Sequence, residues 1–185
     1  MVNRAIAVVA VLAVAGGATG CSSGPDFVYY TTPLPTCADL TTAVTALGMP
    51  NPQPGPQAMS PSANGVDCSF SPAQGTPAPA PDYVSVSVLR PTKQFKDHTP
   101  APGSAFKPQD SCQNTVMPDP DVPHGTSCYE IRGEHSGSAT VTSATKGATI
   151  LVTVRWVDPT ATPAGLQAAA LAKATSLTET VIGKL

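Results

Sequence analysis

Alternating apolar and polar residues predict β-strands in five segments of the chain. The strictest alternation runs from Tyr83 to Leu89, where valines occupy every second position and serines stand between them. The segment from Thr149 to Val157 is the most apolar, and Trp156 ends a row of aliphatic residues on one side of it. The five predicted strands comprise residues 67–71, 83–89, 127–133, 138–144 and 149–157.

Each predicted strand has an apolar face and a polar face. The residues expected to face the core are Val84, Val86, Val88, Tyr129, Ile131, Ile150, Val152, Val154 and Trp156. The opposite face of the last strand carries Thr149, Thr153 and Arg155, and a preceding strand adds Glu130 and Arg132. We expect these charged residues to pair across neighbouring strands.

Two further segments have the periodicity of helices. The first runs from Thr36 to Gly48, with Thr36 as N-cap, Asp39 completing a capping box and Gly48 as a natural stop. Its apolar face consists of Leu40, Val44 and Leu47. The second helix is predicted to begin after Thr162, with Pro163 at its first position. Its apolar side is marked by Leu166, Ala170, Leu177 and Val181.

Proline-rich stretches separate these elements. Residues 49–66, 72–82 and 91–125 are predicted to be irregular, and the second of them is expected to form a long hairpin loop. Short turns at residues 134–137 and 145–147 join the last three strands into an antiparallel meander. The predicted fold class is therefore α+β: an antiparallel sheet of about five strands flanked by an N-terminal and a C-terminal helix, with long Pro-rich loops.

The N-terminal segment has the features of an export signal. Arg4 precedes an unbroken apolar run from Ala5 to Ala15, which is too short to span a bilayer of about 30 Å. This arrangement is typical of a secretory signal peptide. We expect residues 1–20 to be that signal peptide.

The sequence Ala18-Thr19-Gly20-Cys21 follows the signal and resembles a bacterial lipobox. In lipoproteins with this motif, cleavage falls before the cysteine, whose sulfur is fatty acylated; the matching position is Cys21. Residues 21–35 would then be a lipidated tether and residues 36–185 a single domain. The expected location is the extracytoplasmic face of the cell membrane. The alternative is ordinary signal cleavage, which would leave Cys21 as a thiol.

Composition limits the classes of function. The chain of 185 residues has 10 basic and 12 acidic residues, for a net charge of −2, so nucleic acid is not an expected partner. With 21 prolines and only 12% charged residues, an all-helical protein or a coiled coil is excluded.

Four cysteines remain after Cys21, and export favours their pairing in disulfides. These are Cys37, Cys68, Cys112 and Cys128. Three connectivities are possible, and the sequence does not choose between them. None of the spacings contains the Cys-x-x-Cys pair of a zinc site, so no metal is predicted.

No motif for catalysis is found. The stretch Gly133 to Gly137 has His135 where a nucleophile elbow needs serine, and a hairpin turn explains it better. The histidines His98, His124 and His135 lie in predicted loops without the spacing of metal ligands. We therefore predict no enzyme activity, no cofactor and no catalytic residue, although a hydrolase with a site dispersed over several loops stays a third hypothesis.

Several short motifs resemble a family of small exported actinobacterial lipoproteins, of mycobacterial type, that share a domain of unknown function. They are Cys37-Ala38-Asp39-Leu40 opening a helix, Leu47-Gly48 ending it, and Cys68-Ser69-Phe70 in a strand, where Phe70 replaces a common Trp. The resemblance implies a small α+β domain on the outer face of the membrane. It implies no activity and no catalytic residues.

Two functions follow as expectations. The first is a non-catalytic binding or accessory module that meets an unknown protein or lipid of the cell envelope while its lipid anchor holds it to the membrane. The alternative is a carrier of an apolar envelope ligand such as a lipid, held against the apolar row from Ile150 to Trp156.

Overall fold

The computed structural model describes residues 27–29, 32–55, 65–90, 93–95, 114–119, 122, 125–145 and 147–185. The predicted signal peptide, Cys21, Cys112, His98 and His124 lie outside these ranges.

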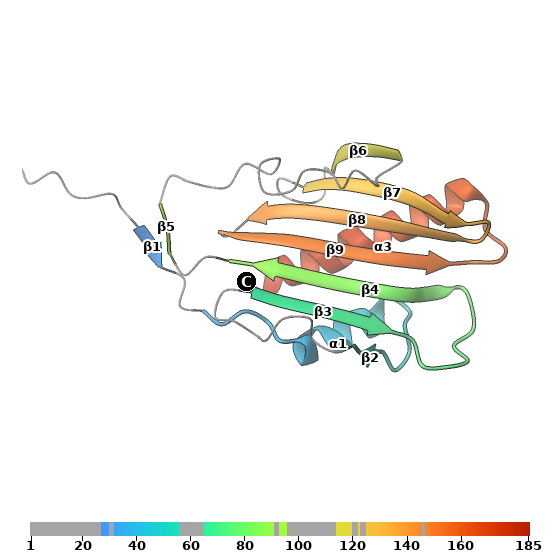
Figure 1. Cartoon of the computed structure of the whole chain (residues 1–185), viewed down its shortest axis with the longest axis horizontal. Coiled ribbons are helices and arrows are strands. Elements are labelled where there is room, and N and C mark those ends of the chain that lie inside the picture. The colour runs from blue at the N-terminus through green and yellow to red at the C-terminus, as the bar shows by residue number, and fades with distance from the viewer. Residues whose placement is uncertain are drawn as a thin grey trace, which may run out of the picture.

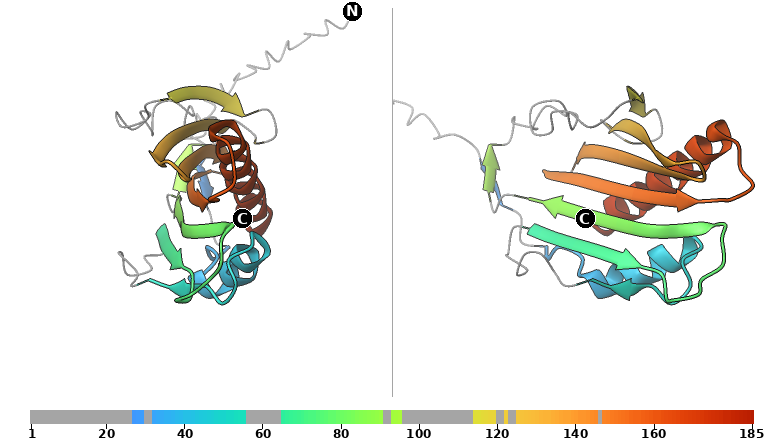
Figure 2. Two further views of the ribbon diagram at one scale, coloured as in Figure 1. Left: turned by 90° about the vertical axis from the view of Figure 1, so that its right-hand side faces the viewer. Right: turned by 45° about the vertical axis from the view of Figure 1, so that its right-hand side comes forward.

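The described chain forms one large antiparallel sheet with two helices on one face (Figures 1 and 2). The strand order is β2-β3-β4-β9-β8-β7-β6. The strands are β2 (Gln53–Pro54), β3 (Gly65–Ser71), β4 (Ala80–Leu89), β6 (Asn114–Asp119), β7 (Gly125–Gly133), β8 (Ser136–Thr145) and β9 (Ala148–Val157). The helices are α1 (Cys37–Ala46) and α3 (Pro163–Lys184). The prediction of an α+β fold with an antiparallel sheet and two flanking helices is confirmed.

The predicted number of strands is too low. All five predicted strands are present as β3, β4, β7, β8 and β9, but β6 makes six strands of six residues or more, and the two-residue β2 pairs with β3. Strand β6 lies in the stretch 91–125 that was expected to be irregular, and it contains Pro118. A proline is tolerated there because β6 is an edge strand, and an edge strand needs hydrogen-bond donors on one side only.

A second, two-stranded sheet was also not predicted. It pairs β1 (Phe27–Tyr29), inside the expected tether, with β5 (Lys93–Phe95). It lies beyond the end of the large sheet where β4 finishes (Figure 1). Three-residue strands are too short to produce an alternation that a sequence pattern can detect.

Strand β4 begins earlier than expected, at Ala80 rather than Tyr83. Its register against β9 shifts between Pro81 and Tyr83, which leaves Asp82 as the extra residue of a β-bulge. Proline is accepted at such a bulge because the ladder of hydrogen bonds is already interrupted.

Both helices begin as predicted. Thr36 caps α1, and its side chain and that of Asp39 bond reciprocally to the backbone N–H groups of Asp39 and Thr36, at 3.3 and 2.8 Å. Gly48 follows the end of α1 with φ +100°, a conformation that glycine adopts at little cost. Thr162 caps α3, and Pro163 is its first residue. The predicted apolar faces of both helices are buried in the core.

The core lies between the helices and the sheet. It contains the predicted valines of β4 and the predicted row Ile150, Val152, Val154 and Trp156 of β9. Two residues of β7 were predicted to face the core. Tyr129 does so and is 4% exposed, but the prediction for Ile131 is wrong, because its side chain is 53% exposed. Ile131 keeps its register opposite Gly137, but it is the last residue before the register shift at the hairpin, and residues 131–135 at this end of the strands are all exposed.

A disulfide joins Cys37 to Cys68, with the two Cα atoms 5.5 Å apart. It fastens the first turn of α1 to the middle of β3. Cys128 is also disulfide-bonded, whereas Cys112 lies outside the described residues. Of the connectivities that the sequence left open, the structure therefore selects one that pairs Cys37 with Cys68.

Candidate functional site

The two faces of the sheet differ in chemistry. One face packs against α1 and α3, while the other has no helix over it in the described part of the chain (Figure 2). We call the second one the open face. Its side chains come from the positions that alternate with the buried core residues of β3, β4, β9, β8 and β7. Most of them are polar and partly exposed.

Strand register arranges the open face in rows that run across the sheet. The first row, which we call the charged row, is Glu130, Ser138, Arg155 and Tyr83. The next row is Cys128, Thr140, Thr153, Ser85 and Ser69. The third row is Thr126, Thr142, Leu151, Ser87 and Asp67. We call the second and third rows the hydroxyl rows, because serine and threonine dominate them.

Arg155 is the centre of the charged row. Its Nε donates to Oδ1 of Asp82 at 2.5 Å, and its guanidinium carbon lies 5.7 Å from the centroid of the Tyr83 ring. Because Asp82 is the extra residue of the bulge in β4, both Asp82 and Tyr83 lie beside Arg155 of β9. Because the Arg155 side chain is still 42% exposed, this ion pair and ring contact are accessible from solvent.

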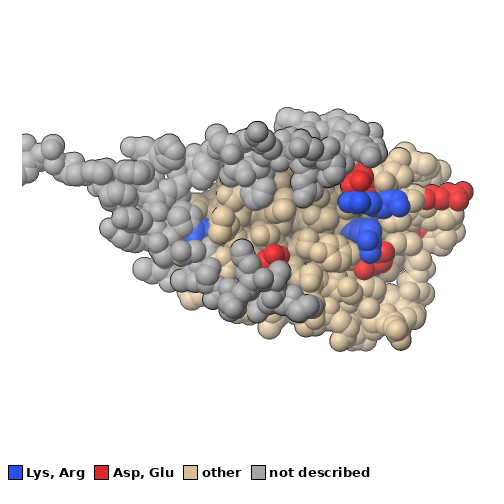
Figure 3. Space-filling view, viewed as in Figure 1, with Lys and Arg blue, Asp and Glu red and all other residues tan. Residues whose placement is uncertain are grey.

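A second ion pair flanks the row on β7. Nη2 of Arg132 lies 2.8 Å from Oε2 of Glu130, and the Arg132 side chain is 51% exposed. Figure 3 shows basic and acidic side chains gathered together on the open face, toward the end where β9 finishes. Each guanidinium here is matched by one carboxylate, so the cluster carries no net charge.

The expected pairing of charges across strands is only partly correct. Arg155 does pair across strands, but with Asp82, which the sequence pattern had placed in a loop. Glu130 pairs with Arg132 of its own strand. The alternation in β4 had placed Tyr83 on the polar face. The proximity of Tyr83 to Arg155 could therefore have been predicted once the pairing of β4 with β9 was known.

One side-chain hydrogen bond joins neighbouring strands within the first of the hydroxyl rows. The hydroxyl groups of Thr140 and Thr153, which face each other on β8 and β9, are 3.0 Å apart. Adjacent strands lie about 4.8 Å apart, so hydroxyl groups recur across the sheet at that interval. The open face therefore offers many donors and acceptors on a backbone that the sheet holds in place.

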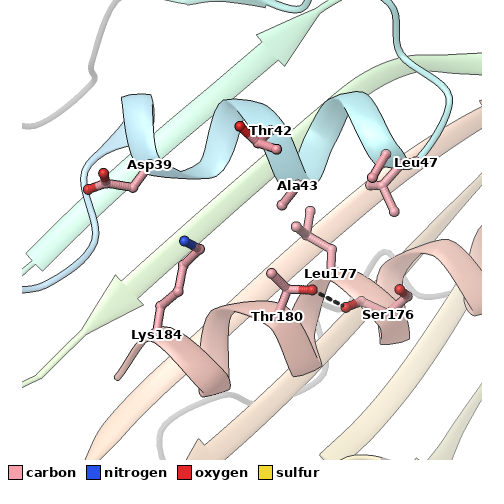
Figure 4. Close-up of a pocket in the computed structure, with 9 residues that line it drawn as sticks. Asp39, Thr42, Ala43, Leu47, Ser176, Leu177, Thr180 and Lys184 are labelled. Atoms are coloured by element: carbon pink, nitrogen blue, oxygen red, sulfur yellow. Dashed lines mark hydrogen bonds between the residues drawn. The ribbon is translucent and has the colours of Figure 1, made fainter.

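The helical side has a groove of about 330 Å³ between α1 and α3. Its floor includes Ala43 and Leu177, and Leu47 closes one end (Figure 4). Asp39 and Lys184 face each other across the other end (Figure 4). The hydrogen bond from the Thr36 hydroxyl is the main cause that lowers the pKa of Asp39, the Thr36 backbone N–H adds to it, and Lys184 contributes little.

The apolar row of β9 does not border this groove. Ile150, Val152 and Val154 are fully buried in the core beneath α3. The Lys173 ammonium of α3 lies 5.6 Å from the centre of the Trp156 ring. These side chains are therefore part of the core that α3 covers.

The other candidate residues are not brought together. Glu134 and His135 are exposed in the hairpin between β7 and β8, which confirms the predicted turn. The Thr160 hydroxyl is the main group that lowers the pKa of Asp158, while the His135 charge is a minor one. Within the described ranges, no three His, Cys, Asp or Glu residues are arranged to hold a metal ion.

No protein-family model matches the chain, and a search of curated proteins found no match. None of the helices in the described residues has the length and hydropathy needed to cross a membrane.

Proposed function

We propose that this protein is an exported, lipid-anchored, non-catalytic binding module that presents the open face of its sheet to a hydrophilic partner in the cell envelope. The observation that carries the proposal is the charged row with the neighbouring Arg132: the guanidinium groups of Arg155, on the central strand β9, and of Arg132, on β7, are paired but solvent-accessible. Side chains on such strands are held more precisely than side chains on loops.

The attachment of the N-terminal segment supports this arrangement. The buried Arg90 follows the last residue of β4 and donates to the backbone carbonyl of Thr32. Asp82 lies near the other end of the same strand, eight residues away, which at about 3.4 Å per residue is about 27 Å. A membrane anchor at Cys21 would therefore attach at one end of the sheet, and the charged row would lie toward the other.

The disulfide supports export. Cys37–Cys68 is formed in the folded domain, and such bonds persist in oxidising compartments outside the cytosol. The small-residue motif before Cys21 adds the lipid anchor, so the membrane and an envelope component are the two proposed partners.

The experiment combines fractionation with site-specific crosslinking in an actinobacterial host. Cys21→Ser should move the full-length protein from the membrane fraction to the soluble exported fraction. A photo-reactive residue at Ser71, exposed at the edge of the open face, should crosslink to an envelope component, whereas one at the exposed Ala172 of α3 should not. Equal crosslinking from both positions, or from neither, would contradict the proposal.

The groove between α1 and α3 supports the second candidate, a carrier of an apolar ligand. Its volume of about 330 Å³ is at the lower end of the range for small-molecule sites, and its floor is apolar. Native mass spectrometry of the full-length protein would test it. A lipid released on activation, and lost in the groove variant Ala43→Trp, would make this candidate the leading one.

A further inference from the structure

We propose that the open face binds an uncharged glycan chain, with Arg155, Tyr83 and Arg132 as its main binding residues. This inference rests on the proposed function, because it names the chemical class of the partner that the open face would meet.

The first argument is electrostatic. The charged row and its neighbours contain two guanidinium groups and two carboxylates in two ion pairs, at 2.5 and 2.8 Å. A polyanion or an anionic membrane is attracted by positive charges that no acid compensates. Because the cluster is neutral overall, a ligand recognised by hydrogen bonds fits it better than a ligand recognised by net charge.

The second argument is the number of directional donors. Arg155 uses Nε for Asp82, and no other described group accepts from its two terminal nitrogens. Arg132 contacts Glu130 through its terminal nitrogen Nη2. A guanidinium has five N–H donors in a planar fork, which suits a pair of neighbouring hydroxyl oxygens. Glu130 and Asp82 supply acceptors beside those donors, so one vicinal diol can both accept and donate here.

The third argument is the platform formed by Tyr83. The Arg155 guanidinium lies over one face of the Tyr83 ring, 5.7 Å from the ring centre, so a ligand would meet the ring at the surface that the arginine leaves free. The negative face of an aromatic ring attracts positively polarised hydrogens. The C–H groups on one side of a pyranose ring are such hydrogens. A sugar can therefore contact the partly exposed surface of Tyr83 that Arg155 does not cover, while its hydroxyl groups reach the guanidinium donors.

The fourth argument separates a glycan from a protein partner. The cores of protein interfaces are depleted in serine, and serine and threonine are under-represented among their energetic hot spots. The hydroxyl rows consist mostly of these residues. The large hydrophobic side chains that are exposed in the described chain, Leu89 and Ile131, belong to different strands, and neither lies in the three rows. A polyhydroxylated chain lying across the hydroxyl rows can exchange hydrogen bonds along its length.

The test measures binding by the full-length protein, purified from membranes in mild detergent, using isothermal titration calorimetry. The probes are short neutral oligosaccharides, namely a β-1,4-linked N-acetylglucosamine tetramer, a mannan oligomer and an arabinan oligomer. Polyphosphate and anionic lipid vesicles are the charged probes. We expect at least one neutral oligosaccharide to bind, with a Kd that changes less than about twofold between 50 and 500 mM salt.

Two variants locate the site. Arg155→Gln removes the fork, and Tyr83→Leu removes the ring; each should weaken glycan binding about tenfold or more, the factor that corresponds to about 1.4 kcal/mol. Tyr83→Phe keeps the aromatic ring and should lose much less affinity for the glycan. Glu179→Gln, on the exposed side of α3, is the matched control and should bind like the parent. Thermal unfolding of each variant identifies any loss that comes from misfolding.

Several outcomes would overturn the inference. They are binding of polyphosphate or vesicles alone, glycan binding that neither Arg155→Gln nor Tyr83→Leu affects, and no binding of any neutral oligosaccharide. In the last case, crosslinking from Ser71 to an envelope protein would leave the proposed function standing, whereas absence of crosslinking as well would contradict both.

Discussion

At the scale of single residues, Tyr129 has an unusual environment. Its hydroxyl group is buried and has no hydrogen-bond partner among the described residues, and burial raises the pKa of the phenol. Tyr129 lies on β7 and its ring covers Gly137 of β8: a Cβ added at Gly137 would be 2.0 Å from the Tyr129 hydroxyl oxygen. An aromatic side chain over a strand glycine fills the space that the missing side chain leaves.

Tyr129→Phe should leave the free energy of unfolding unchanged or raise it by up to about 1 kcal/mol at pH 7, because it removes an unpaired buried hydroxyl. Since the folded pKa is raised, the neutral phenol favours the folded state below about pH 10, and this contribution is lost as the pH rises through the folded value. Urea unfolding from pH 7 to 11 checks both points. A marked destabilisation at pH 7 would contradict them.

Gly137→Ala should destabilise the protein by about 1–3 kcal/mol, because the new methyl group meets the Tyr129 ring. Gly133→Ala is the matched control, because a Cβ at Gly133 would have no neighbour within 4 Å. In a Tyr129→Ala background the cost of Gly137→Ala should shrink. If the two glycine variants unfold at the same urea concentration, the contact with Tyr129 is not the cause.

At the scale of elements, the two helices have different N-terminal caps. The capping box of α1 links Thr36 and Asp39 in both directions. Thr162 at the start of α3 accepts from the backbone N–H of Gly165 at 3.2 Å, and glycine offers no side chain to return the bond. The sequence predicted both caps, because capping depends on residues within one turn.

Thr36→Ala should cost about 1 kcal/mol of stability. It should also change the pH dependence. The pKa of Asp39 is lowered in the folded state, so its contribution is present above about pH 4 and is lost as the pH falls through the folded value. The slope of unfolding free energy between pH 5 and pH 2 should decrease in Thr36→Ala. Thr162→Ala should cost a similar amount at neutral pH without changing that slope.

The Cys37–Cys68 bond closes a loop of about 30 residues between α1 and β3. On the chain-entropy account, such a loop stabilises the folded state by about 3 to 4 kcal/mol. The double variant Cys37→Ser/Cys68→Ser should lose about this amount in urea unfolding. A loss below about 1 kcal/mol would mean that packing alone holds α1 on β3.

At the scale of the whole molecule, the N-terminal segment and the charged row are at opposite ends of β4. Arg90 holds the N-terminal segment at Thr32, and β1 pairs with β5 beyond that end of the large sheet (Figure 1). The position of the proposed anchor and the direction of the open face are therefore linked through one strand.

Arg90→Met should loosen this connection while keeping much of the packing of the side-chain stem. Hydrogen exchange followed by mass spectrometry should show faster exchange for peptides that cover residues 32–36, with little change in β8 and β9. Uniformly faster exchange over all strands would mean that Arg90 stabilises the entire domain rather than this connection.

The sequence predicted much of the fold but only part of the candidate site. Residues with strict alternation or helical spacing, such as Val84 to Val88 and Leu40 to Leu47, were assigned correctly because one buried face dictates their period. Asp82 was missed as the partner of Arg155, since a β-bulge displaced it from any regular period. Strand β6 was missed because an edge strand with a proline lacks alternation.

By itself, the sequence determined the class of fold, the capped helices, the five main strands and most of the predicted core positions, because each depends on neighbours a few positions apart. The tertiary structure decided the rest. It paired Cys37 with Cys68 and brought Asp82 and Tyr83 beside Arg155, although 73 positions separate Asp82 from Arg155 in the chain. It also packed α3 against the apolar row of β9 and arranged the side chains of the open face in rows. These features depend on strand order and register. Contacts between segments that are distant in the chain form only when the strands pair and the helices pack on the sheet.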